Sequence, residues 1–121
     1  MDFAIKDSRP IWQQLTEQLR QRIVTGVYPP GSRFPAVREL AAQAGVNPNT
    51  MQRAMGQLEA DALVITNRTQ GRTVTEDREV LEAMRRSLAL ARTREYLQEM
   101  KALDYDAAAA AELVREEGET T

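Results

Sequence analysis

The stretch that decides the fold is FPAVRELAAQAGVNPNTMQRAMGQLEADAL, residues 34–63. Its apolar spacing predicts two short helices, over 36–44 and 47–61, which meet at Gly45. Gly45 suits the left-handed residue that follows a helix end, and Asn47 suits the capping position that opens the next helix. Two short helices joined in this way predict a helix-turn-helix.

The second of these helices has two distinct faces when its residues are placed at 100° intervals. One face is an apolar stripe made of Met51, Ala54, Met55 and Leu58. The opposite face carries Asn49, Gln52, Arg53 and Gly56. An apolar stripe backed by small polar side chains is typical of a helix that reads the major groove of DNA.

Further elements are expected on both sides of this motif. Ile11, Leu15, Leu19 and Ile23 recur every four residues, which predicts an amphipathic helix to about residue 25. After the motif, 64–66 and 72–75 have strand character, and turn-forming residues separate them. This pair predicts a β-hairpin, which would be the wing of a winged helix-turn-helix domain over residues 1–75.

Residues 76–121 are charged and helical in character. A long helix to about residue 103 is expected, then a short one over 107–116 capped by Asp106, with the last four residues frayed. The long helix has more apolar surface than it can bury alone, which predicts a two-helix dimerisation region. The residues expected in the dimer interface are Leu81, Met84, Leu88, Leu90, Leu97, Met100 and Leu113. The whole chain is thus expected to be mostly α, with one small β-hairpin.

Composition narrows the possible functions. The 121 residues include no cysteine and no histidine, which excludes Cys-His zinc sites, thiol nucleophiles and histidine bases. We therefore expect no enzyme activity, no cofactor and no metal. No run is long and apolar enough for a membrane helix, and the N-terminus has acids where a secretion signal is basic, so a cytoplasmic protein is expected.

The charge is unevenly distributed along the chain. The net charge is -2, but residues 1–75 hold nine Lys or Arg against six Asp or Glu. Residues 76–121 hold seven against twelve. The cationic excess therefore falls on the half with the helix-turn-helix, which supports a nucleic-acid partner there.

Residues 9–75 resemble the DNA-binding domain of GntR-type transcriptional regulators. The motifs occur in the family's order and spacing and are Pro10-Ile11, Pro30-Gly31, FPAVRELA at 34–41, GVNPNT at 45–50, Arg53-Ala54, Leu58-Glu59 and Leu63. The short helical tail is similar to that of the YtrA branch, in which this region serves dimerisation. The resemblance implies a dimeric repressor on a palindromic operator, and the YtrA branch suggests a transporter operon as the target.

The resemblance and the helix faces together select the candidate DNA-binding residues. They come from the helix before the turn, the start and outer face of the second helix, and the wing tip, and are Arg38, Asn47, Asn49, Thr50, Gln52, Arg53, Arg68, Gln70 and Gly71. Arginine and glutamine can make bidentate contacts to guanine and adenine. For Asn47, capping its own helix is the favoured role, and Arg53 could instead contact Gln57 four residues on.

The sequence departs from the family pattern at several positions. Ala36 stands where a capping serine is common, and Ala62 stands where glycine usually ends the second helix. The wing lacks the first glycine and the aromatic residue of the usual Gly-x-Gly-Thr-Phe-Val. These departures leave the conformation of the wing open.

Two other functions deserve comparison. A winged helix can serve as a protein-protein interaction module, which a net-acidic chain with an unusual wing would suit. GntR-type domains also occur fused to pyridoxal-phosphate enzymes, but this chain has only Lys6 and Lys101 and no room for such a domain. A small-molecule effector at the dimer interface stays open, although two helices cannot enclose a pocket alone.

Overall fold

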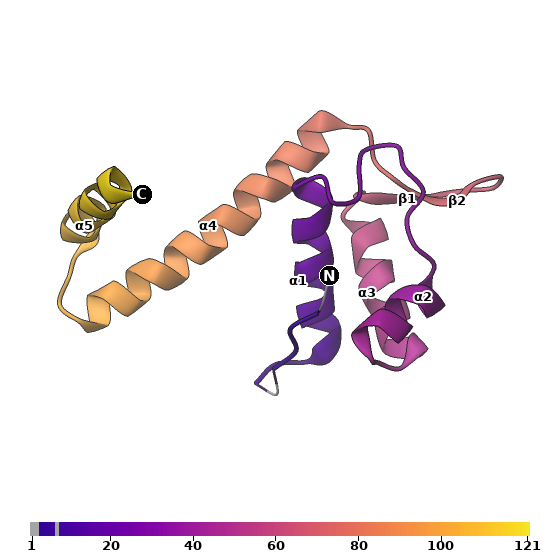
Figure 1. The fold of residues 1–121 in the computed structure, drawn as a ribbon, viewed down its shortest axis with the longest axis horizontal. Helices are drawn as coiled ribbons and strands as arrows, with labels where there is room; N and C mark the ends of the chain where they lie inside the picture. Colours follow the sequence, from indigo (N-terminus) through magenta and orange to yellow (C-terminus); the bar gives the residue numbers. More distant parts are fainter. Residues whose placement is uncertain (1–2, 7) are drawn as a thin grey trace. The chain divides into compact units, whose positions relative to one another are not determined.

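The computed structural model describes residues 3–6 and 8–121, and Figure 1 shows its elements. In chain order they are α1 (Ile11–Val24), α2 (Val37–Ala44), α3 (Pro48–Ala60), β1 (Val64–Asn67), β2 (Gly71–Val74), α4 (Arg78–Ala102) and α5 (Ala107–Thr120). The prediction of a mostly helical chain with one hairpin is confirmed. None of the described helices is long and apolar enough to cross a membrane.

The core of the N-terminal unit lies between α1, α3 and the hairpin. Apolar side chains from these elements and from α2 pack together, and the largest fully buried ones include Leu15, Leu19, Ile23, Leu40, Met51, Met55, Leu58, Leu63 and Val74. The residues expected on the inner face of α3 are all buried. Burial of this face turns the opposite, polar face of α3 toward solvent.

The hairpin forms without the family's first wing glycine or aromatic residue. β1 and β2 are antiparallel, with Val64 opposite Val74 and Asn67 opposite Gly71. The Asn67 side-chain oxygen accepts hydrogen bonds from the amide N and the Oγ1 of Thr69, both at 3.0 Å. Gly71 has a φ of 75°, a conformation that glycine adopts readily. An asparagine-supported turn therefore replaces the usual wing sequence.

A third chain segment pairs with the outer edge of β2. The Phe34 amide donates to the Arg72 carbonyl at 2.7 Å, and the Gly31 amide donates to the Val74 carbonyl at 2.9 Å. Gly31 has a φ of 79°, and a Cβ there would meet the end of the exposed Glu76 side chain, which can move aside. The backbone conformation at this turn therefore favours glycine.

Residues before α1 are fastened to it by two glutamine side chains. Gln14 Nε2 donates to the carbonyls of Lys6 and Arg9, and Gln14 Oε1 accepts from the Lys6 amide at 2.7 Å. Gln18 pairs in the same manner with the amide and carbonyl of Ala4. The two side-chain amides thus provide hydrogen-bond partners for backbone N–H and C=O groups that pair with no strand of the described chain.

The chain divides into two compact units, one up to Arg85 and one from Arg86 to Thr121, so that α4 contributes to both. Within the first unit, Leu81 and Met84 from the first turns of α4 pack against its core. Those two residues therefore have a packing role inside the chain, besides the dimer contact predicted for them.

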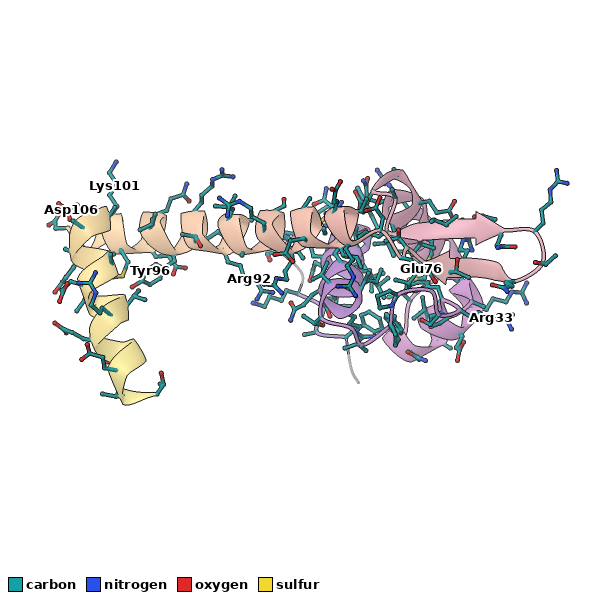
Figure 2. All side chains as sticks on the ribbon, turned by 90° about the horizontal axis from the view of Figure 1, so that it is seen from above. Arg33, Glu76, Arg92, Tyr96, Lys101 and Asp106 are labelled. Carbon is teal, nitrogen blue, oxygen red and sulfur yellow. The ribbon has the colours of Figure 1, made fainter. Side chains whose placement is uncertain are left out.

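The second unit consists of the rest of α4 and of α5. Asp106 caps α5 as predicted, because its Oδ1 accepts from the Ala109 amide at 2.9 Å. The expected end of this helix at residue 116 is too early, since α5 continues to Thr120. In its last turn the Thr120 hydroxyl donates to the Glu117 carbonyl. Figure 2 shows Tyr96 and Lys101 on α4 and Asp106 at the start of α5.

Candidate DNA-binding surface

The start of α3 is built by a cap and a proline. Asn47 Oδ1 accepts a 2.7 Å hydrogen bond from the Asn49 amide, and Pro48 occupies the first helical position. This cap uses the Asn47 side-chain oxygen within the protein, as its favoured interpretation predicted. Asn49 and the half-buried Thr50 are left at the helix N-terminus, where the positive end of the helix dipole favours a phosphate.

The outward face of α3 is a row of exposed residues: Asn49, Gln52, Gly56 and Ala60. Side chains become small toward the C-terminal half of this row. A Cβ at Gly56 would meet no atom within 4 Å, so packing inside the protein does not require glycine there. The row thus offers polar groups at the start of the helix and close approach to its backbone further along.

Salt bridges flank this row on both sides. On the side of the wing, Arg72 Nε lies 2.6 Å from Glu59 Oε1. On the side of α1, Arg20 forms two hydrogen bonds with the Asp61 carboxylate, at 2.8 and 3.0 Å. These two arginines therefore hold α3 against the wing and against α1.

Other arginines keep their donors available. Arg38 on α2 and Arg68 at the wing tip are exposed and form no hydrogen bond or ion pair with any described residue. Gln70 and Gly71 are exposed beside Arg68. Arg38 projects from the first turn of α2, whose preceding residue Ala36 provides no side-chain cap, as predicted.

Arg53 has a neighbour that the sequence did not indicate. It forms no hydrogen bond with Gln57, the alternative partner, and its guanidinium carbon lies 4.1 Å from the centre of the Trp12 ring on α1. Arg53 is nonetheless exposed, and no described residue accepts a hydrogen bond from it. It therefore lies on the α1 side of the outward row and keeps its donors.

Arg33 was missed by the sequence reasoning. It is exposed, forms no ion pair with a described residue, and belongs to the segment that pairs with β2, opposite Thr73. Figure 2 shows it near the hairpin. The feature that points to Arg33 is the pairing of residues 31–34 with the wing. The sequence patterns of the two hairpin strands do not reveal this pairing.

The fold and this surface define a winged helix-turn-helix DNA-binding regulator. The family model for bacterial regulatory proteins of the gntR family matches residues 12–74. The chain belongs to this family. It is a transcription regulator and not an enzyme, in agreement with the sequence analysis.

Individual relatives refine the assignment. The chain is 35% identical over 103 residues to the HTH-type transcriptional regulator YhcF of Bacillus subtilis, covering 85% of each chain. It is 35% identical over 72 residues to the HTH-type transcriptional repressor YtrA of Bacillus subtilis, covering 60% of this chain and 55% of that protein.

Among solved structures, a GntR family transcriptional regulator from Listeria monocytogenes superimposes with a TM-score of 0.83 at 34% identity, over 93% of this chain and 98% of that one. These similarities support the YtrA-like assignment.

Proposed function

We propose that the protein is a dimeric repressor that binds a palindromic operator and blocks the initiation of transcription. The observation that carries the proposal is the outward face of α3, which begins with polar side chains, together with three exposed arginines whose donors no described residue uses, Arg38, Arg53 and Arg68. The start of α3 would enter the major groove, where Asn49 and Gln52 reach base edges or phosphate. Arg68 at the wing tip would enter the adjacent minor groove.

The dimer is supported by the uncovered surface of α4. This helix has 25 residues and none of them is buried in a single chain. Its apolar side chains beyond Arg85 stay exposed or half-buried, and these are Leu88, Leu90, Leu97 and Met100, with Leu113 on α5. A second copy would cover them and place two recognition helices on half-sites one helical turn apart, ~34–36 Å.

The regulatory target follows from the resemblance. YtrA-like regulators tend to control transporter operons, so the promoter of a transporter operon is the first place to search for the operator. We place the protein in the cytoplasm, where bacterial DNA lies.

Selection of sites from a random duplex library with the purified protein tests the proposal. We expect enrichment of a two-fold symmetric motif, with binding that weakens steeply as salt increases. No enrichment, together with capture of a protein partner through α3, would instead support the interaction-module function. An asymmetric motif would contradict the dimer and leave DNA reading intact.

A further inference from the structure

Trp12 is the single tryptophan of the chain, and it lies outside the helix-turn-helix motif. Its ring on α1 faces the guanidinium of Arg53 on α3 at 4.1 Å. Trp12 is half-buried while Arg53 is exposed. The exposed guanidinium of Arg53 therefore covers one face of a ring that belongs to α1, the helix that packs on α3.

This contact leaves the hydrogen-bonding capacity of Arg53 unused. A guanidinium stacked on a ring uses its flat face, whereas its N–H donors point outward in its own plane. No described residue accepts a hydrogen bond from Arg53. Arg20 and Arg72 differ from Arg53, because their guanidinium groups donate hydrogen bonds to carboxylates.

Stacking also restricts where these donors can point. A free arginine side chain samples many rotamers and loses that freedom when it binds. Ring contact removes part of this freedom before any ligand arrives. Arg53 belongs to the recognition helix, whose outward row begins at Asn49 four residues earlier. A restricted Arg53 therefore presents its donors next to that row.

We propose that Trp12 is a positioning residue for DNA reading: its ring orients Arg53 so that the guanidinium edge meets one base pair. This inference rests on the proposed function. Trp12 itself acts through Arg53, so its removal should change the discrimination that Arg53 provides. Trp12 lies on α1, so this positioning residue is outside the helix-turn-helix motif that contains the recognition helix.

The test uses the full-length protein, the selected operator and a set of operators with single base-pair changes. Arg53→Ala should lose roughly 5- to 100-fold discrimination at one base pair of each half-site. Trp12→Ala should lose roughly 2- to 5-fold at the same base pair, the effect of an exposed cation–π contact. The double variant should match Arg53→Ala, and Trp12→Phe should keep most of the discrimination.

Controls separate positioning from folding. Thermal melting shows whether Trp12→Ala stays folded, and Trp12→Phe carries the test if it does not. Arg85→Ala, whose side chain is 65% exposed on α4, controls for the lost positive charge.

Three results would overturn the positioning role. They are a uniform loss on all duplexes with Trp12→Ala, tighter binding with Trp12→Ala, and losses from Trp12→Ala and Arg53→Ala that simply add. In each of these cases the parent protein still discriminates among operators. If the parent protein selects no operator at all, the proposed function fails and this inference fails with it.

Discussion

At the scale of single residues, Ala62 adopts a conformation that suits glycine. It follows α3 with a φ of 63°, where the family usually has glycine. A left-handed alanine costs roughly 1–2 kcal/mol, and glycine gives part of this back as greater freedom in the unfolded chain. We expect Ala62→Gly to raise the free energy of unfolding by about 0.5–1 kcal/mol, measured by urea denaturation.

A matched alanine inside a helix provides the control for that experiment. Ala60 is exposed at the end of α3, where glycine carries only its helix penalty. Ala60→Gly should therefore lower the stability, by up to about 1 kcal/mol. If both variants shift stability in the same direction, strain at Ala62 is not the cause.

Arg38 and Arg72 test whether a free arginine and a committed arginine differ. Arg38→Ala should weaken operator binding and reduce the slope of log affinity against log salt by about 1, with little change in stability. Arg72→Ala removes the salt bridge to Glu59 and should lower the free energy of unfolding more than it weakens operator binding. Fluorescence anisotropy at several salt concentrations measures the binding. An unchanged salt slope for Arg38→Ala would remove it from the set of phosphate contacts.

At the scale of elements, the Arg20–Asp61 pair fixes α3 against α1. Asp61 is 11% exposed and Arg20 is 22% exposed, and Gln57 Nε2 also donates to the carboxylate at 3.1 Å. Such a bidentate pair is little screened by water, and breaking it leaves an unpaired charge. We expect Asp61→Asn to cost about 1–3 kcal/mol of stability, measured by thermal and urea unfolding.

An exposed pair gives the comparison for Asp61. Glu82 and Arg85 are 68% and 65% exposed at 3.6 Å, and such pairs contribute little. Glu82→Gln should therefore leave the unfolding curve almost unchanged. Equal effects from Asp61→Asn and Glu82→Gln would mean that the Arg20–Asp61 pair does not anchor the two helices.

At the scale of the whole molecule, the apolar residues of α4 and α5 predict a homodimer. Leu97→Glu would place an uncompensated charge in the interface and should raise the dimer dissociation constant by at least about 100-fold. Gln98→Glu adds the same charge at an exposed neighbouring position and should not. Analytical ultracentrifugation measures both. If Leu97→Glu stays dimeric at the concentrations where the parent does, the interface lies elsewhere.

The elements and their ends could be predicted because local physics determines them. The Asn47 and Asp106 caps, the left-handed Gly45 and the hairpin each depend on residues only a few positions apart. The end of α5 was the exception. The charged and small residues at this end were expected only to fray, because they contain no strong helix-stop signal. The helix in fact runs to Thr120.

By itself, the sequence determined the helix-turn-helix, the wing and the face of α3 that points away from the core, since periodicity and capping act over one or two turns. Only the tertiary structure decided which group each arginine contacts. Arg20 meets Asp61 and Arg53 meets Trp12, each across 41 positions of the chain. Such partners are set by the packing of α1 on α3, which no local pattern specifies. Arg38 and Arg68 keep their donors because no carboxylate in the described chain is folded against them.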